Sequence, residues 1–263
     1  MDKLRVCTWN IKQGQYLPTL LKEIGSQKDF SGLDILAIQE SFIHDEVEDA
    51  AKIAEKLGPQ YKYFQENVKI TFGLLQGNAF IWNSDRITIK KKMSFFLPGV
   101  RDKHTTRLEK MFFRLLPKQD RNCLVLEGTF GKHSIRIYVT HLDVLGYTHK
   151  RAQLKAIFTH ALSQKPTDFC CIIGDFNTYK FVTRPNWKNL AEDASESGFQ
   201  DLTTEILWTF SRRRVRFKQK LDSIFIKPFD YKYKSWSLDI NGSDHIPVFS
   251  DIHLNKRSKS TDE

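Results

Sequence analysis

The sequence has no long apolar run and few cysteines. No apolar stretch approaches the roughly 18 residues that a membrane-spanning helix needs, so we expect no transmembrane segment. The four cysteines form no Cys-x-x-Cys pair, which argues against a cysteine zinc site. A strand pattern begins directly after Met1 and leaves no room for a signal peptide. We therefore expect a reduced, intracellular protein, most simply a cytoplasmic one.

Internal repeats and linkers are also lacking, which favours a single domain over residues 1–254 and a disordered polar tail over residues 255–263. The chain has 263 residues, of which 40% are hydrophobic and 13% aromatic, enough for one packed core. We expect a monomer. A formal net charge of +10 points to a polyanionic partner, either nucleic acid or an anionic phospholipid surface.

Apolar runs predict the strands, and helical spacing of apolar residues predicts the helices. Continuous apolar runs are typical of strands buried on both faces. We expect strands over residues 6–10, 33–38, 78–82, 124–130, 135–141, 169–173, 207–210, 221–226 and 248–254. Helices are expected over residues 17–28, 46–57, 148–162 and 187–197. The mixture of hairpins and alternating elements predicts an α/β fold, a four-layer α/β/β/α sandwich with two mixed β-sheets packed face to face and helices outside.

Polar side chains stand at the ends of several of these strands. Six short motifs contain them: Thr8-Trp9-Asn10-Ile11, Gln39-Glu40, Thr140-His141-Leu142-Asp143, Gly174-Asp175-Phe176-Asn177, Leu221-Asp222-Ser223-Ile224-Phe225 and Ser243-Asp244-His245. In this order, and over nearly the whole chain, the motifs resemble those of the endonuclease/exonuclease/phosphatase superfamily, which has the deoxyribonuclease I-like fold. The resemblance implies that residues 1–254 form such a domain and hydrolyse phosphoesters with the help of a metal.

The resemblance also implies a metal site. Glu40 would be the principal ligand of Mg²⁺ or Mn²⁺, a hard cation that prefers oxygen ligands. Asn10 would support this site, and Asp244 is expected to share in it. Taken alone, a Glu after a strand is usually only a solvated strand end.

Catalytic roles follow from the same resemblance. Asp175 and Asn177 would orient the attacking water and bind a phosphoryl oxygen, although the same pair could form only an Asx turn. His245 would be either a general base or a cationic stabiliser of the transition state, and Asp222 would fix its tautomer. His141 would bind phosphate or assist the leaving group.

Substrate-binding residues are expected around this centre. Asn78 would contact phosphate or orient His141. Arg151 would bind substrate, but an outward-facing salt bridge is equally compatible with its place near the start of a helix. Residues 211–220 hold six cations and no acid and lead directly into Asp222. In this segment Arg212, Arg213 and Arg214 are expected to bind nucleic-acid phosphates, with a solvated hairpin turn as the alternative.

A second basic segment, residues 101–121, has seven Lys or Arg residues against three acids. Its interleaved apolar residues could stack on unpaired bases, lie on an anionic membrane, or form a buried helix face. The leading prediction is a Mg²⁺- or Mn²⁺-dependent, nuclease-like phosphodiesterase acting on nucleic acid. The alternatives are a phospholipid or small-molecule phosphodiesterase or phosphatase, similar to sphingomyelinases or phosphoinositide phosphatases, and a non-catalytic scaffold with the same fold.

Overall fold

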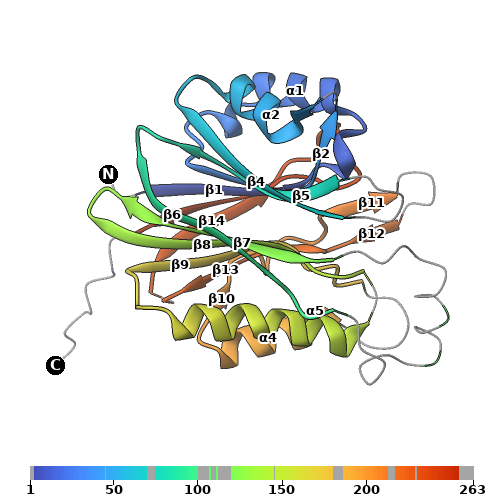
Figure 1. Cartoon of the computed structure of the whole chain (residues 1–263), viewed down its shortest axis with the longest axis vertical. Helices are drawn as coiled ribbons and strands as arrows, with labels where there is room; N and C mark the ends of the chain where they lie inside the picture. The colour runs from blue at the N-terminus through green and yellow to red at the C-terminus, as the bar shows by residue number, and fades with distance from the viewer. Residues whose placement is uncertain are drawn as a thin grey trace.

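The computed structural model describes residues 3–44, 46–69, 75–99, 107, 111, 120–144, 146–179, 186–212, 217–228 and 230–254. They form two mixed β-sheets that pack face to face, with helices on both outer faces (Figure 1). The predicted α/β/β/α sandwich is therefore confirmed. The predicted tail over residues 255–263 and most of the basic segment over residues 101–121 lie outside the described residues.

The first sheet has the strand order β14-β15-β1-β2-β5-β4. Its strands are β1 (Lys3–Asn10), β2 (Ile35–His44), β4 (Tyr61–Lys69), β5 (Leu75–Asn83), β14 (Lys232–Ser237) and β15 (Val248–His253), and the short β3 (Val47–Glu48) pairs with β2. Strands β1 and β2 run parallel, whereas β15 and β5 are antiparallel to their neighbours.

The second sheet has the order β10-β13-β9-β8-β7-β6. It contains β6 (Ile87–Phe96), β7 (Asn122–Phe130), β8 (His133–His141), β9 (Phe169–Asp175), β10 (Gln200–Asp201) and β13 (Asp222–Lys227). Here β8 and β9 are the parallel pair. A separate hairpin, β11 (Phe210–Arg212) with β12 (Phe217–Gln219), lies at the end of the sandwich opposite to the start of β1 (Figure 1).

Within the described ranges, four α-helices cover the sheets. Helices α1 (Leu17–Ser26) and α2 (Asp49–Leu57) lie over the first sheet, and α4 (Tyr147–Ser163) and α5 (Asn186–Glu196) over the second (Figure 1). Single 3-10 turns, η1 (Lys12–Gly14) and η2 (Lys28–Phe30), flank α1. Among the described residues, none of the helices combines the length and apolar character needed to span a membrane.

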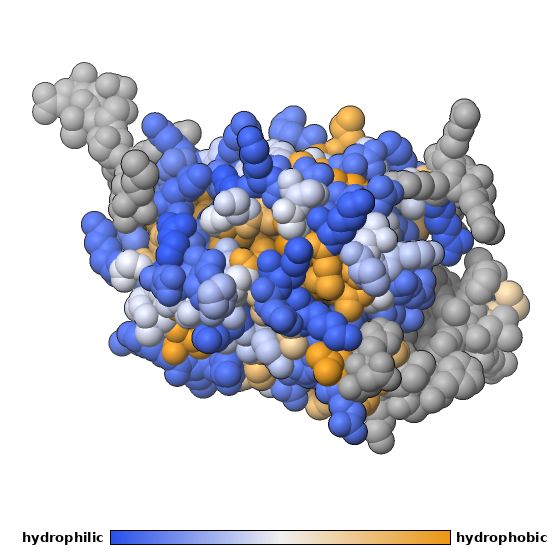
Figure 2. Space-filling model, turned by 90° about the horizontal axis from the view of Figure 1, so that it is seen from above, coloured by the Kyte–Doolittle hydropathy of each residue, from blue (hydrophilic) through white to orange (hydrophobic). Residues whose placement is uncertain are grey.

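The core is divided into three apolar layers because the central strands are buried on both faces. In β9, Cys171 and Ile173 pack between the two sheets, whereas Cys170 and Ile172 pack under α4 and α5. This alternation follows from the two-residue period of a strand. A third layer, which includes Trp9, lies under α1 and α2. The face on that side is mostly hydrophilic, with apolar residues visible between polar ones (Figure 2).

Some predicted boundaries differ from the structure. The strand expected over residues 207–210 begins only at Phe210, and the helix expected from Glu46 begins at Asp49 because β3 precedes it. Strands β4, β6, β10 and β14, which are the edge strands of the two large sheets, were not predicted. The short strands β3 and β12 were not predicted either.

Gly174 allows the close pairing of β8 with β9, and its replacement tests how strongly that pairing is constrained. A Cβ atom at Gly174 would lie 1.9 Å from the Thr140 carbonyl oxygen. We expect Gly174→Ala to lower the free energy of unfolding by about 3 kcal/mol or more, because the backbone strands would have to separate. Denaturant unfolding measures the loss.

The control is Gly131→Ala in the turn between β7 and β8. Gly131 has φ +55°, but a Cβ atom added there would meet no heavy atom within 4 Å, so only backbone strain of about 1 kcal/mol is expected. Equal losses for the two variants would contradict the steric argument.

Candidate functional site

Strand ends from both sheets meet at one edge of the sandwich. Asn10 ends β1, His141 ends β8, and Asp175 ends β9. The parallel register places His141 beside Asp175, and the antiparallel register of β13 places Asp222 on its other side. Because the carboxyl ends of parallel strands meet at one sheet edge, these polar side chains converge although their positions in the sequence are far apart.

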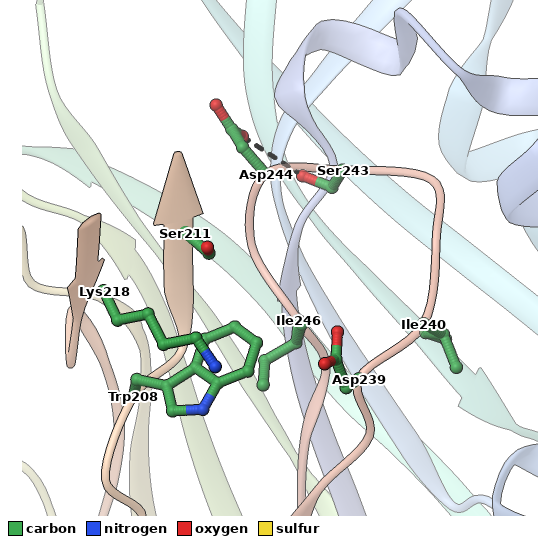
Figure 3. A pocket seen from close by; sticks show the side chains of 8 residues that line it. All are labelled: Trp208, Ser211, Lys218, Asp239, Ile240, Ser243, Asp244 and Ile246. Atoms are coloured by element: carbon green, nitrogen blue, oxygen red, sulfur yellow. Dashed lines mark hydrogen bonds between the residues drawn. The ribbon is translucent and has the colours of Figure 1, made fainter. Parts of the chain in front are cut away.

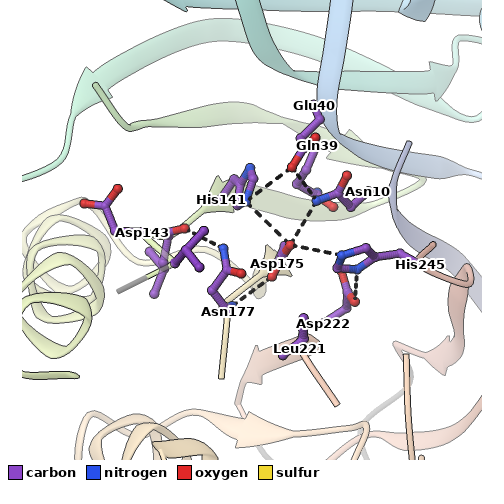
Figure 4. Close-up of polar contacts among 12 residues, drawn as sticks. Asn10, Gln39, Glu40, His141, Asp143, Asp175, Asn177, Leu221, Asp222 and His245 are labelled. Carbon is purple, nitrogen blue, oxygen red and sulfur yellow. Dashed lines mark hydrogen bonds and ion pairs between the residues drawn. The ribbon is translucent and has the colours of Figure 1, made fainter. Parts of the chain in front are cut away.

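The Asp175 carboxylate lies at the centre of this group (Figure 4). Its Oδ2 accepts a hydrogen bond from Asn10 Nδ2 at 2.9 Å. The same oxygen lies 3.5 Å from His141 Nε2 and 3.7 Å from His245 Nε2. Its Oδ1 accepts a hydrogen bond from the Asn177 backbone at 2.8 Å. Asp175 is fully buried, so the surrounding side chains fix its orientation.

Glu40 approaches the same centre from β2. The pairing of β2 with β5 shifts register between Ile38 and Ser41, and Glu40 has φ +57° at this irregularity. A bulge of this kind redirects a side chain. Glu40 Oε1 accepts a hydrogen bond from Asn10 Nδ2 at 3.2 Å and lies 3.9 Å from His141 Nε2. Asn10 thus joins the two carboxylates.

His245 is backed by a second carboxylate. Its Nδ1 lies 2.8 Å from Asp222 Oδ2, and both side chains are buried. The loop that carries His245 is tied to β1, because Trp9 Nε1 donates to the His245 carbonyl oxygen at 3.0 Å. The Phe210 ring packs 5.0 Å from the imidazole, centroid to centroid. These contacts leave Nε2 directed toward Asp175 (Figure 4).

Burial and neighbouring charges separate the protonation states of these groups. Burial, with a further contribution from Asp222, raises the pKa of Asp175 to about 7. Burial also raises the pKa of Glu40. Burial alone would lower the pKa of His245, but Asp222 and Asp175 outweigh it and raise that pKa to about 10. At neutral pH His245 is therefore an imidazolium cation between two carboxyl groups.

The donor set fits a hard divalent cation. Asp175, Asp222 and His245 have potential ligand atoms that all lie within 4.8 Å of one another, but a protonated His245 has no lone pair to give to a cation. The Asn10 amide joins Glu40 Oε1 to Asp175 Oδ2, so that three carboxyl groups, those of Glu40, Asp175 and Asp222, gather at one point. Oxygen-rich sites with this excess of negative charge suit Mg²⁺ or Mn²⁺. The Asp244 carboxylate instead pairs with Lys12 at 3.3 Å.

The residues predicted to bind substrate lie in different surroundings, some next to the site and some on the surface. Asn78 donates to Asn122 Oδ1 at 3.0 Å rather than contacting His141, although both line one small cavity of about 10 Å³. Arg151, exposed on α4, pairs with Asp193 of α5, and its expected role in substrate binding stays a prediction. Arg151 thus forms the salt bridge that was the alternative to substrate binding.

Arg212 is exposed on β11, at the side of the site, whereas Arg213 and Arg214 lie outside the described residues. The hairpin β11–β12 and the loop before β15 enclose a groove of about 390 Å³ (Figure 3). Trp208, Ser211, Lys218, Asp239, Ile240, Ser243, Asp244 and Ile246 line it. The Lys218 ammonium lies 3.8 Å from the centre of the Trp208 ring. The groove therefore borders His245 on the hairpin side.

Two buried cations were missed by sequence reasoning. Arg121 Nη1 lies 3.0 Å from His141 Nδ1, and Lys150 Nζ donates to the Asn177 carbonyl oxygen at 2.6 Å. Lys150 also donates to the Val144 carbonyl oxygen at 3.1 Å, so it joins the loops that follow β8 and β9. In the sequence, both residues look like ordinary surface cations of basic segments. Only the position of Arg121 directly before the apolar run of β7 distinguishes it.

The sequence matches no protein-family model and no curated protein sequence. The structure, in contrast, superposes on solved structures over almost its whole length. An endonuclease/exonuclease/phosphatase from Bacteroides vulgatus aligns with a TM-score of 0.71 and 15% identity, covering 96% of this chain and 99% of that one. The chain has the endonuclease/exonuclease/phosphatase fold.

Two other structures with the endonuclease/exonuclease/phosphatase fold differ in what they bind or act on. D. rerio TDP2, solved with a single-strand DNA product, has a TM-score of 0.68 and 14% identity, with 96% and 99% of the two chains covered. A mannosyl-6-phosphatase from Bacteroides thetaiotaomicron has a TM-score of 0.68 and 18% identity, with 95% and 99% covered. At these identities the likeness establishes the fold.

Replacement of Asp222 tests the electrostatics of the site. We expect Asp222→Asn to lower the pKa of His245, because the carboxylate that opposes the effect of burial is removed. An NMR titration of the imidazole measures the shift. Asp244→Asn is the matched control, since Asp244 contributes less to the raised pKa of His245. A larger fall in the control would show that the raised pKa has another origin.

Proposed function

We propose that the protein is a divalent-cation-dependent phosphoester hydrolase, most specifically a phosphodiesterase that acts on nucleic acid. One observation carries this proposal. A single buried carboxylate, Asp175, contacts Asn10 and lies within 4 Å of both His141 and His245. This places a proton acceptor, two imidazoles and a pair of carboxylates around one point, which is the equipment that hydrolysis of a phosphoester by an activated water requires.

Glu40, with the support of Asn10, is the residue proposed to hold Mg²⁺ or Mn²⁺, next to Asp175. When bound, the cation would polarise a phosphoryl oxygen and neutralise charge on the leaving oxygen. Asn177 would contribute to the alignment of phosphate. Its side chain is held by a hydrogen bond from Nδ2 to the Leu142 carbonyl oxygen at 2.8 Å, and its φ is +49°.

The protonation states assign the acid–base roles. His245 keeps its proton at neutral pH, since its pKa is about 10, and so it serves as a cationic stabiliser of the charged transition state rather than as a base. Asp175, with a pKa of about 7, is the group that accepts a proton from the attacking water. The water oxygen attacks phosphorus in line with the leaving oxygen.

The proposal of a nucleic-acid substrate is supported by charge and by position. The chain carries a net charge of +10. Ser211 of β11 donates its backbone N–H to the Asp244 carbonyl oxygen at 2.8 Å, so the hairpin that bears Arg212 adjoins the residue before His245. Cations at this position suit the phosphates that flank a scissile bond. The complex of D. rerio TDP2 with a single-strand DNA product supports the same substrate class.

Metal-dependent cleavage of nucleic acid tests the proposed reaction. With Mg²⁺ present, we expect the protein to cleave single-stranded or plasmid DNA or single-stranded RNA. His245→Gln should reduce the rate by about 10²–10³-fold, because the charged imidazole that stabilises the transition state is lost. His253→Gln is the matched control, since His253 is exposed on β15, and its rate should be unchanged.

Sphingomyelin, phosphoinositides and a sugar monophosphate are offered in parallel, the last because a mannosyl-6-phosphatase shares the fold. Turnover of one of these, with neither DNA nor RNA cleaved, would replace the nucleic-acid substrate by a lipid or small phosphoester. Absence of metal-dependent turnover with every substrate would contradict the hydrolase itself.

Proton release on binding tests the proposed cation ligands. The pKa of Asp175 is about 7, so this carboxyl group holds a proton near neutral pH that a cation bound next to it would displace, and burial also raises the pKa of Glu40. We expect Mn²⁺ binding to release protons at about pH 6–7 and to release few at about pH 9, with affinity increasing as pH rises. Calorimetry in buffers of different ionisation enthalpy measures the release.

Asp175→Asn should remove most of this proton release, whereas Arg151→Gln, on the exposed face of α4, should leave it intact. Mn²⁺ binding without any dependence on pH would show that the cation does not bind next to these carboxyl groups.

A further inference from the structure

His141 has a buried arginine as the partner of its second ring nitrogen. Arg121 Nη1 lies 3.0 Å from His141 Nδ1, and the two residues are 8% and 4% exposed. A guanidinium has only donors and stays charged at any pH that the protein tolerates. The contact is therefore a hydrogen bond from Arg121 to an unprotonated Nδ1. Because a guanidinium can only donate, this contact by itself fixes which ring nitrogen of His141 lacks a proton.

Arg121 is itself held firmly. Its Nε donates to Asp143 Oδ1 at 3.1 Å. Asp143 is shared with His149, whose Nε2 lies 2.6 Å from Oδ2, and with Gln153, whose Nε2 donates to Oδ2 at 3.0 Å. The Asp143 backbone N–H donates to Gln153 Oε1 at 3.0 Å. This buried network holds the guanidinium through its Nε, so that Nη1 stays directed toward His141.

The other ring nitrogen of His141 faces the site. Its Nε2 lies 3.5 Å from Asp175 Oδ2 and 3.9 Å from Glu40 Oε1, both longer than a good hydrogen bond. With Nδ1 occupied as an acceptor, a neutral imidazole must carry its proton on Nε2. The N–H therefore points toward the space between the two carboxylates, where the phosphate would bind.

We propose that Arg121 is a positioning residue that holds His141 as a neutral Nε2–H donor, so that His141 gives a hydrogen bond to a non-bridging phosphoryl oxygen and gives no proton to the leaving group. This inference rests on the proposed function for its substrate and resolves the two roles expected for His141. The water oxygen bonds to phosphorus, its proton passes to Asp175, and the P–O bond to the leaving group breaks. The leaving oxygen then takes a proton from solvent.

The tautomer is tested without any substrate. In the full chain labelled with [¹⁵N]histidine, long-range ¹H–¹⁵N correlation distinguishes a protonated from an unprotonated ring nitrogen. We expect Nδ1 of His141 to be unprotonated and Nε2 protonated at neutral pH in the wild-type protein. A protonated Nδ1 would overturn the proposal, whatever the outcome of the activity assays.

Two variants of Arg121 separate positioning from a merely structural role. Arg121→Lys keeps an N–H donor of nearly the same reach and should preserve the tautomer, whereas Arg121→Met removes the donor and should shift it. Asp143 retains His149 and Gln153 as partners in both. Loss of a residue that orients a functional side chain typically lowers activity by about 10–100-fold, which we expect for Arg121→Met but not for Arg121→Lys.

A kinetic comparison tests the absence of proton donation. His141→Gln retains an N–H donor, so the fold-loss in kcat/KM should be the same for bis(p-nitrophenyl) phosphate, which has a good leaving group, and for a dinucleotide, whose alkoxide leaving group needs protonation. A much larger loss for the dinucleotide would make His141 a general acid and overturn the proposal. If neither diester is hydrolysed, the proposed function fails while the tautomer measurement still decides the role of Arg121.

Discussion

Asp175 carries a carboxylate that is fully buried where strand ends of the two sheets meet, and residues from both sheets are oriented by it. Asn10 reaches it from the first sheet and His141 from the second, while His245 approaches from the loop before β15. Such burial is possible because the close pairing of β8 with β9 at Gly174 brings His141 into register with Asp175. The site therefore depends on the face-to-face packing of the two sheets. A shift of either sheet would separate the side chains that contact the Asp175 carboxylate.

The sequence was informative where strands are buried on both faces and uninformative where they are not. All eight interior strands of the two sheets gave apolar runs, as in Phe169–Ile173 of β9, and were predicted. The edge strands β4, β6, β10 and β14 were missed. Strand β6 shows the reason: Lys90, Lys91 and Lys92 are exposed in succession, since an edge strand meets solvent along one side and charged residues there prevent association with other chains. A pattern based on apolar runs cannot detect such a strand.

Within the site, the residues at strand ends could be predicted because the topology brings strand ends together. The residues that support them could not. Arg121 and His141 are 20 positions apart, and their contact depends on the antiparallel pairing of β7 with β8, which brings the residue before β7 to the end of β8. For Arg151, the position on a helix left substrate binding and a salt bridge equally open, and the partner on α5 is visible only in the packing of the two helices. The position of a side chain that acts through another side chain is set by tertiary packing. A single sequence contains little information about such contacts.

The hairpin β11–β12 is joined to the loop that carries His245 by backbone hydrogen bonds, from Ser211 to Asp244 at 2.8 Å and from Ile246 to Thr209 at 2.7 Å. Thr209 in turn accepts the backbone N–H of Asp222 on its side-chain oxygen at 3.0 Å. The segment that borders the groove is therefore mechanically continuous with both members of the His245–Asp222 pair. The hairpin can therefore not be exchanged without moving the backbone that holds this pair, so a change in the shape of the groove would also change the geometry of His245 and Asp222.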